Sequence, residues 1–293
     1  MKVLVTGKNG QVGYTLARKL SSISDVDVLP LDRKELDIGN YDSVRKIITE
    51  FRPDVVINAA AYTAVDKAEA EPDIAYNTNH LGSKNLALCT EEIGALLIHL
   101  STDYVFSGDK KGLYNESDIT DPVSVYGKTK RDGENAIIDV CSRYIIMRTS
   151  WVFCEYGNNF VKTMLRLAKS HQQLRIVADQ YGGPTYAGDM ADAIIHLMNT
   201  IIREKKEKYG IYHYSGLPQV NWSEFAEYIF EQAKKENIIE ASPVVIKIPT
   251  SEYPTAAQRP KNSMMSTDRI TADFGILASD WMRALNSLTD YKN

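Results

Sequence analysis

The amino-terminal half of the chain alternates short runs of apolar, often β-branched residues with longer segments that carry apolar residues at helical spacing. The runs predict strands at 2–6, 27–32, 54–59, 95–101 and 143–149, and the longer segments predict helices at 11–21, 41–51, 72–93 and 124–139. Strands that alternate with helices across short connections favour an α/β fold with a doubly wound parallel sheet, covered by helices on both faces.

The pattern changes after about residue 155. Helices are predicted at 159–169, 188–203 and 222–237, the last capped by Asn221, with strand-like segments LRIVADQ, GIYHYSG and VVIKIPT between and after them. We therefore expect two regions. Residues 1–155 form the domain built on the sheet, and residues 156–293 form mainly a smaller α/β cap, some of whose segments return to the sheet.

The first predicted strand runs directly into a glycine-rich turn, Gly7-Lys8-Asn9-Gly10-Gln11-Val12-Gly13. Glycines at this spacing permit a tight strand-to-helix turn, let the backbone approach a pyrophosphate and allow close packing of helix on sheet. The helix that follows directs the positive end of its dipole at the phosphates. The turn therefore indicates a dinucleotide-binding domain of Rossmann type.

The second predicted strand ends in Asp32, about 20 residues beyond the last glycine. A carboxylate at this position accepts hydrogen bonds from the adenosine ribose and disfavours a 2′-phosphate. Arg33 and Lys34 follow it, and such cations are able to accept that phosphate. We expect NADPH or NADH, with no preference between the two.

Tyr126 and Lys130 stand four residues apart in SVYGKTKRDGE, within a predicted helix. This spacing puts both side chains on one helix face, where the ammonium is expected to lower the pKa of the phenol. A phenol poised in this way is a general acid for proton delivery to an oxygen while hydride reaches the attached carbon. By itself the pair is also compatible with a surface helix that carries the two residues by chance.

Polar or aromatic residues follow the later strands of the predicted sheet. Ser101-Thr102-Asp103 come after the fourth strand and Ser150-Trp151 after the fifth, while the third leads into Asn58-Ala59-Ala60-Ala61-Tyr62-Thr63. The carboxyl ends of parallel strands line the active site in this architecture. Small residues there let a cofactor lie close to the backbone, and the hydroxyl groups face an incoming carbonyl.

Composition indicates an ordinary soluble enzyme. The 293 residues are 44% apolar, enough for one large domain or two, and the net charge of −4 with interspersed signs argues against a nucleic-acid surface. No apolar run reaches the length of a membrane span, and the first strand starts at residue 2, which leaves no room for a signal peptide. We expect a cytoplasmic protein without a nucleic-acid or membrane partner.

The metal-ligating residue types show no ligand pattern. Cys89, Cys141 and Cys154 have neither metal-ligand nor redox spacing, and the five histidines form no His-x-x-x-His pair. We expect no metal site and no disulfide. The carboxyl tail has no evident carboxylate cluster for a metal between subunits, so the oligomeric state stays open, a homodimer included.

Several motifs resemble the extended short-chain dehydrogenase/reductases, and among them the dTDP-4-dehydrorhamnose reductases. They are GKNGQVG, NAAAYTAVDKAE, STDYVF, YGKTK and RTSWVF, followed by DQYGGPT, GIYHYSG and RPKNS, so the resemblance covers nearly the whole chain. NAAAYTAVDKAE and STDYVF are much more specific than the glycine turn or Tyr-x-x-x-Lys, which the whole superfamily shares.

The resemblance implies reduction of the C4 ketone of a dTDP-linked 6-deoxy-4-ketohexose by NAD(P)H. Tyr126 would donate the proton, Lys130 would tune its pKa and hold the nicotinamide ribose, and Thr102 would polarise the carbonyl oxygen. The product would be dTDP-L-rhamnose, a precursor of cell-surface polysaccharide. Other implied roles concern the dinucleotide: Gly10, Gln11 and Val12 at the pyrophosphate, Asp32 at the ribose, Asp37 and Ile38 at the adenine, and Ala61, Tyr62 and Thr63 at its middle.

The resemblance also implies a set of substrate contacts. Asp103 would hold a sugar hydroxyl and Trp151 the sugar ring, with Val65 and Tyr104 as pocket walls. Alternatives remain for three positions: Asp103 as a turn cap, Trp151 as core between the fifth strand and the cap, and Arg259 either on the nucleotide diphosphate or pinning the carboxyl-terminal loop.

Proteins that resemble this chain also include dehydratases, epimerases and a non-catalytic subunit. A 4,6-dehydratase would place an acidic pair after the threonine, whereas here Thr102 is followed by Asp103 and Tyr104, which favours simple reduction. Another nucleotide-sugar reductase or an epimerase is an alternative. A non-catalytic dinucleotide-binding protein, similar to the regulatory subunit of methionine adenosyltransferase, is another.

Overall fold

Six parallel strands form the central sheet of the computed structural model, which describes residues 1–291. Their order is β10-β5-β4-β3-β1-β2. The strands are β1 (Lys2–Thr6), β2 (Asp27–Leu31), β3 (Val55–Asn58), β4 (Leu96–Thr102), β5 (Tyr144–Thr149) and β10 (Gly210–His213). The prediction of a doubly wound parallel α/β sheet is confirmed.

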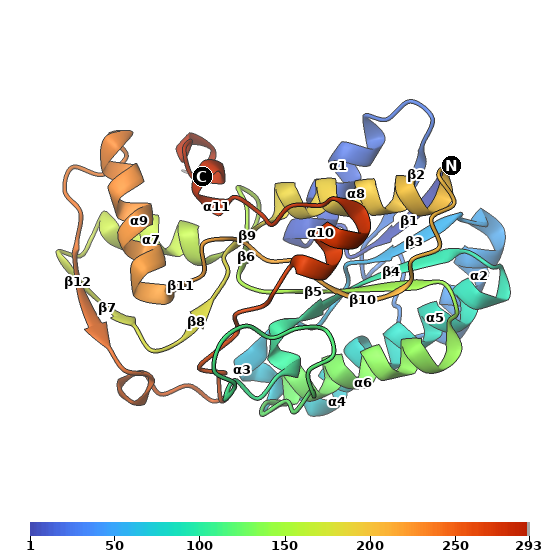
Figure 1. The fold of residues 1–293 in the computed structure, drawn as a ribbon, viewed down its shortest axis with the longest axis horizontal. Coiled ribbons are helices and arrows are strands. Elements are labelled where there is room, and N and C mark those ends of the chain that lie inside the picture. Colours follow the sequence, from blue (N-terminus) through green and yellow to red (C-terminus); the bar gives the residue numbers. More distant parts are fainter. Residues whose placement is uncertain (292–293) are drawn as a thin grey trace.

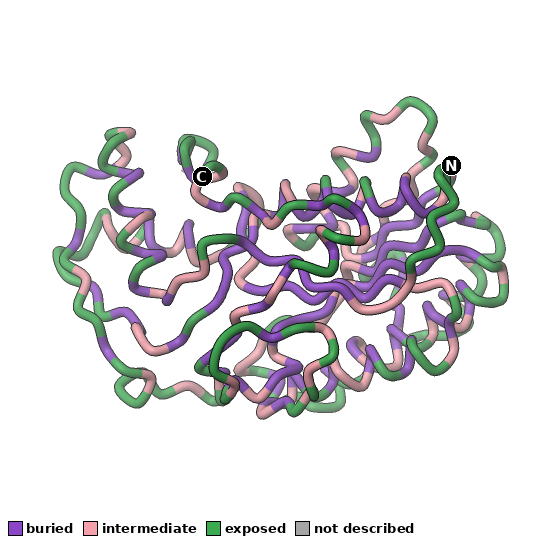
Figure 2. Tube along the Cα trace, viewed as in Figure 1, coloured by how far each residue is buried: buried purple, intermediate pink, exposed green. Residues whose placement is uncertain are grey.

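Helices cover both faces of this sheet (Figure 1). On one face α1 (Gln11–Ser21) packs against α8 (Ala187–Ile202), and on the other lie α2 (Tyr41–Phe51), α5 (Gly82–Glu92) and α6 (Val125–Val140). Successive side chains of a strand point to opposite faces, so Val3 and Val5 enter the first core and Leu4 the second. The inner strands β1, β3, β4 and β5 are almost wholly buried (Figure 2), which explains their nearly continuous apolar sequence.

The strand order reverses at β1, because β2 lies on one side of it and β3 on the other. A crevice opens at the carboxyl ends of the strands where the connections diverge in this way. The segments that leave β1, β2 and β3 therefore meet there, although they are far apart in sequence.

The second half of the chain divides between this sheet and a smaller lobe, at the left in Figure 1. Strand β10, α8 and α10 (Asp268–Phe274) belong to the sheet side. The lobe has its own apolar core, in which Leu165, Phe225 and Trp281 are buried. Its elements are β6 (Val152–Phe153), α7 (Phe160–Ala168), β7 (Gln173–Val177), β8 (Tyr181–Gly182), β9 (Thr185–Tyr186), β11 (Val220–Asn221), α9 (Trp222–Lys235), β12 (Val244–Ile248) and α11 (Trp281–Ala284).

Asn221 caps α9 as predicted, since its side chain accepts from the backbone of Glu224, whose carboxylate accepts in return from the backbone of Asn221. All three cysteines are free and buried. Within residues 1–291, none of the helices has the length and apolarity that crossing a membrane requires.

The helix predicted at 72–93 is interrupted. It consists of α4 (Pro72–Tyr76), a π-helical turn at Asn77–Leu81, and α5. The wide turn lets the side chain of Asn79 bind both backbone groups of Tyr62, at 2.8 Å from its nitrogen and 3.2 Å from its oxygen. Apolar periodicity carries no trace of such a contact. The short helix α3 (Val65–Ala68) and the 3-10 turns Asp103–Val105, Thr250–Glu252 and Thr289–Tyr291 were also not expected.

Candidate active site

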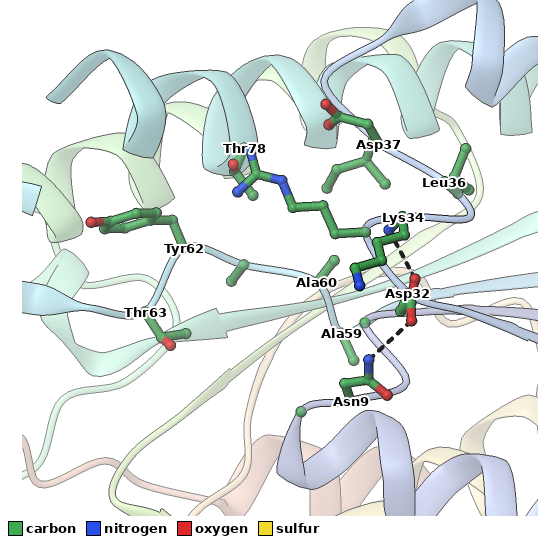
Figure 3. Close-up of a pocket in the computed structure, with 15 residues that line it drawn as sticks. Asn9, Asp32, Lys34, Leu36, Asp37, Ala59, Ala60, Tyr62, Thr63 and Thr78 are labelled. Atoms are coloured by element: carbon green, nitrogen blue, oxygen red, sulfur yellow. Dashed lines mark hydrogen bonds between the residues drawn. The ribbon is translucent and has the colours of Figure 1, made fainter. Parts of the chain in front are cut away.

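Two adjoining cavities occupy the carboxyl edge of the sheet. The first, of about 630 Å³, lies against the segments that follow β1, β2 and β3 (Figure 3). The second, of about 460 Å³, reaches the ends of β4 and β5 and the first turns of α6. The two cavities lie next to each other, because both are lined by Asn9, Gly10, Ala59, Ala61 and Thr63.

The glycine turn shapes the junction of the two cavities. Gly7 has φ +76°, and a Cβ there would lie 2.7 Å from the carbonyl carbon of Ala59. A Cβ on Gly13 would overlap the carbonyl oxygen of Gly7. Gly10 is the N-cap of α1 and has no side chain that could bind the N–H groups of the first turn. These N–H groups are therefore available to an anion. The turn fits the pyrophosphate of a dinucleotide.

Gln11 lines the second cavity, but its side chain is engaged elsewhere. The amide donates to the backbone oxygen of Val152 at 3.1 Å and accepts from the backbone nitrogen of Cys154 at 3.0 Å. Asn159 also donates to its oxygen. The side chain of Gln11 therefore ties α1 to β6, and its backbone N–H is the group that remains for an anion.

Both oxygens of the Asp32 carboxylate have partners within the protein. One accepts from the Asn9 amide at 3.0 Å, and the other from the backbone nitrogens of Lys34 at 2.8 Å and Glu35 at 3.2 Å (Figure 3). The carboxylate thus caps its own turn. Arg33 and Lys34 line the same cavity, so cations as well as a carboxylate face the space in which the adenosine ribose is expected.

The remaining residues expected around the dinucleotide also line these two cavities. Asp37 and Ile38 line the first cavity and Val12 the second. Tyr62 lines the first cavity, and its phenol donates to the carboxylate of Glu71.

Tyr126 and Lys130 are buried in α6, 8% and 1% exposed, and both line the second cavity. Burial raises the pKa of Tyr126 to about 12, opposed by a hydrogen bond with Thr102. The expectation that Lys130 lowers the pKa of this phenol is wrong. Its Nζ donates to the oxygen of Leu100 at 2.6 Å and lies 3.2 Å from Nε2 of His99. Because α6 buries both groups against the sheet, the loss of hydration dominates, and burial lowers the pKa of Lys130 to about 8.

Thr102 ends β4 and Asp103 begins the turn that follows, and both residues line the second cavity. The Thr102 hydroxyl donates to Asp103 at 2.9 Å and accepts from the backbone nitrogen of Tyr104 at 3.2 Å. Burial raises the pKa of Asp103 to about 6, opposed by hydrogen bonding from Ser263 and Thr102. Tyr104 meets the ring of Tyr126 edge to face at 5.5 Å. Three of the predicted site residues, Thr102, Tyr104 and Tyr126, are therefore in mutual contact.

Trp151 joins the two lobes at the rim of the second cavity. Its φ is +48°, an unfavourable conformation for a large side chain, and its indole stacks on Trp222 of α9 with ring centroids 3.5 Å apart. The ring packs against the core of the lobe, as the alternative expected, and it also lines the cavity, so its contact with the sugar ring stays a prediction. Val65 begins α3 and packs against the cluster that contains Tyr126.

Arg259 lines neither of these cavities. It lines another pocket, of about 280 Å³, and its Nη2 lies 2.8 Å from the carboxylate of Asp66. The same carboxylate accepts from the backbone nitrogen of Ala257 at 3.1 Å. These contacts correspond to the alternative in which Arg259 pins its own loop.

Some lining residues escaped the sequence analysis. Asn9 lies within the glycine turn and could have been included on that ground. Thr78 comes from the π-helical turn, inside what the sequence predicted as a regular helix. His99 and Trp222 carry no motif, and their contacts with Lys130 and Trp151 arise only from the folded chain.

The chain is similar to proteins of one family along nearly its whole length. The family model described as "RmlD substrate binding domain" matches residues 1–292. A dTDP-4-dehydrorhamnose reductase of Aggregatibacter actinomycetemcomitans is 49% identical over 290 residues, 99% of this chain and 99% of that protein.

Solved structures agree. A dTDP-4-dehydrorhamnose reductase of Clostridium acetobutylicum superposes with a TM-score of 0.90 at 40% identity, covering 98% of this chain and 97% of the other. One from Bacillus anthracis, in complex with NADP, has a TM-score of 0.89 at 39% identity, with 97% and 96% covered. With this agreement of sequence, fold and site, the chain belongs to the RmlD substrate-binding-domain family.

Proposed function

We propose that this chain reduces the C4 ketone of dTDP-4-dehydro-L-rhamnose to dTDP-L-rhamnose with NADPH or NADH. The observation that carries the proposal is the pair of adjoining cavities, the second of which is lined both by the glycine turn and by the buried phenol of Tyr126. The relatives described above, which are named dTDP-4-dehydrorhamnose reductases, support the choice of substrate.

The first cavity would hold the adenosine end of the dinucleotide. Asp37 and Ile38 would contact the adenine, and Asp32 and Arg33 would meet the ribose or its 2′-phosphate. Backbone N–H groups of Gly10, Gln11 and Val12 would bind the pyrophosphate, in the turn that Gly7 and Gly13 make possible. Ala61, Tyr62 and Thr63 would flank the middle of the molecule. When bound, the dinucleotide supplies the hydride for C4.

Tyr126 delivers the proton in this proposal. Its raised pKa keeps the phenol protonated at neutral pH, so it can donate to the C4 oxygen as negative charge develops there. Thr102 would turn its hydroxyl to the same oxygen, and such donors stabilise developing charge most when they are held in place beforehand. Lys130, one helical turn from Tyr126, would hold the nicotinamide ribose.

The sugar nucleotide would occupy the outer part of the second cavity. Asp103 would hold a sugar hydroxyl and Trp151 would form one wall against the ring, with Val65 and Tyr104 opposite. Arg259 would donate to the diphosphate through N–H groups other than Nη2, which pairs with Asp66, or by exchanging the Asp66 carboxylate for the diphosphate.

Further parts of the proposal concern organisation. Residues 1–155 would serve dinucleotide binding, and residues 156–293 would serve mainly substrate binding. The chain would work in the cytoplasm, with a homodimer as one candidate assembly, and its product would supply cell-surface polysaccharide synthesis.

The test is loss of reduced-nicotinamide absorbance on mixing the protein with dTDP-4-dehydro-L-rhamnose. We expect turnover, and a fall of at least ~100-fold in Tyr126→Phe, the scale of losing a positioned general acid. Tyr212→Phe is the matched control, because Tyr212 is also buried but bonds to Asp273 away from the site. Equal rates in Tyr126→Phe and the parent protein would refute the role of this phenol, and absence of any turnover in the parent would refute the substrate.

A further inference from the structure

A row of buried polar side chains crosses the sheet directly behind the active site. Thr6, Asn58 and His99 are neighbours on β1, β3 and β4, since the register pairs the first with the second and the second with the third. Each is at most 1% exposed. They point towards the α5 and α6 layer, because the residues two positions earlier on the same strands belong to the core on that side. Lys130 meets the end of this row from α6.

The orientation of the Asn58 amide is fixed by a backbone N–H group, which can only donate a hydrogen bond. The backbone N–H of Ala60 donates to Oδ1 of Asn58 at 3.1 Å, and the hydroxyl of Thr6 donates to the same atom at 2.7 Å. A backbone N–H can only donate, so the atom that it meets is the amide oxygen. The amide nitrogen therefore faces Nδ1 of His99, at 2.9 Å, and donates to it.

This contact determines the tautomer of His99. Because Nδ1 accepts from Asn58, the single proton of the neutral imidazole resides on Nε2. Burial holds the pKa of His99 well below its ordinary value, so the ring is neutral. The Nε2–H group is directed at Nζ of Lys130, 3.2 Å away.

A donor facing Nζ discriminates between the two charge states of Lys130. An ammonium has three N–H groups and no lone pair, so it cannot accept a hydrogen bond from Nε2–H. An uncharged amine accepts this hydrogen and still donates to the oxygen of Leu100 at 2.6 Å. The uncharged amine therefore finds both a donor, Nε2–H of His99, and an acceptor, the oxygen of Leu100, around Nζ.

We propose that His99 is a positioning residue whose Nε2–H donates to Lys130 and favours the uncharged amine of that lysine inside the active site. Its role in catalysis rests on the proposed reduction. After Tyr126 has given its proton to the C4 oxygen, the Lys130 ammonium can return a proton to the phenolate. It is then left as the amine that His99 accommodates, and a proton from solvent restores it.

Other ionisable groups bear on Lys130 from the surrounding elements. Glu134, one turn further along α6, favours the ammonium. Arg148 of β5 binds both oxygens of that carboxylate and so offsets its charge. Tyr126 and Asp103 line the same cavity as Lys130. The effect of His99 opposes that of Glu134, and His99 is the ionisable side chain among these that lies within hydrogen-bonding distance of Nζ.

The direct test is an NMR titration of the Lys130 side chain in the whole protein, with its ¹³Cε signal assigned by loss in Lys130→Met. His99→Gln places an amide near the position of Nε2, where its oxygen can accept from the ammonium. We expect the titration midpoint of Lys130 to rise by at least ~1 pH unit in this variant, the scale on which a hydrogen-bonding partner shifts a buried group. His99→Asn keeps the contact with Asn58 but not that with Lys130, so it should give a smaller rise.

Thr6→Val is the matched control. It removes a buried hydrogen bond from the same row, but the N–H of Ala60 still orients the Asn58 amide. The Lys130 midpoint should therefore stay at its parent value. Midpoints in His99→Gln and His99→Asn equal to the parent value would overturn the proposal, as would a shift of the same size in Thr6→Val.

A second readout separates this inference from the proposed reduction. The pH profile of kcat/KM should move in His99→Gln in the same direction as the NMR midpoint, whereas a purely structural defect would lower the rate at every pH alike. If the NMR midpoint shifts but the parent protein does not turn over the sugar nucleotide, the assignment of His99 stands and the reduction fails. If the parent turns over and the midpoint does not shift, the reduction stands and the assignment of His99 fails.

Discussion

The ion pair between Glu134 and Arg148 joins helix α6, which carries Tyr126 and Lys130, to the sheet. Nε and Nη2 of Arg148 donate to the two carboxylate oxygens at 2.9 and 2.6 Å, and the hydroxyl of Ser101 donates to the same carboxylate. The two charged side chains are only 3% and 2% exposed. Arg148 also lies over the ring of Phe106, 5.1 Å from its centroid. Removing either partner therefore leaves a buried charge with almost no access to water.

We expect Arg148→Met to lower the free energy of unfolding by about 3–5 kcal/mol, the cost of leaving one buried ion without its partner. Glu134→Leu should cost a similar amount. The double variant should lose about 2–3 kcal/mol less than the sum of the two single losses, because an apolar pair of similar volume leaves no unpaired charge.

Urea unfolding followed by tryptophan fluorescence measures these differences, completed as a double-mutant cycle. The control is Glu231→Gln, which breaks the exposed pair with Lys235, 2.8 Å apart and about 60% exposed on each side. Water screens that pair, so its loss should leave the unfolding midpoint unchanged. The reasoning would be refuted if each single variant lost less than ~1 kcal/mol of unfolding free energy, or if the loss in the double variant equalled the sum of the two single losses.

Three further outcomes follow from the site. Trp222→Ala removes the stack on Trp151 and should raise KM for the sugar nucleotide about 2- to 10-fold while leaving KM for NADPH unchanged. Equal increases in both KM values would contradict a role of this stack in substrate binding. Burial raises the pKa of Asp103 from 3.8 to about 6, so the folded state binds a proton that the unfolded state releases, and stability falls as pH rises between those values. Asp103→Asn should abolish this pH dependence in urea unfolding measured from pH 4 to 7, and it should raise the free energy of unfolding by up to about 3 kcal/mol above pH 6. An unchanged pH dependence would mean that other groups cause it. Arg33→Ala should weaken NADPH binding by at least ~10-fold in fluorescence titration and NADH binding much less, since only NADPH carries the 2′-phosphate. Equal losses for both dinucleotides would mean that Arg33 does not bind the 2′-phosphate.

The alternation of strands and helices was largely readable from the sequence. Five predicted strands match strands of the sheet to within one or two residues, because strands buried on both faces need continuous apolar runs. GIYHYSG was recognised as strand-like, but nothing in its seven residues says that it pairs with β5 in the main sheet. That choice depends on α8, which returns the chain across the sheet before β10 begins.

The expectation for the Tyr126 phenol shows where local reasoning failed. Spacing correctly placed Tyr126 and Lys130 at one cavity, but it suggested that charge would control the pKa of the phenol. In the folded protein both side chains are pressed between α6 and the sheet, and desolvation is the larger effect. The neighbours that engage Lys130, Leu100 and His99, lie on β4, about 30 residues earlier in the chain.

The sequence alone determined the class of fold, the position of the glycine turn, and many of the residues that reach the carboxyl edge of the sheet, because these depend on periodicity and on local backbone geometry. Tertiary structure decided the contacts that control the chemistry. It turned the Asp32 carboxylate back onto its own turn, stacked Trp151 on Trp222, and directed one tautomer of His99 at Lys130. Such contacts join segments far apart in sequence, and their energies come from burial and from the direction of hydrogen bonds, which exist only once the chain has packed.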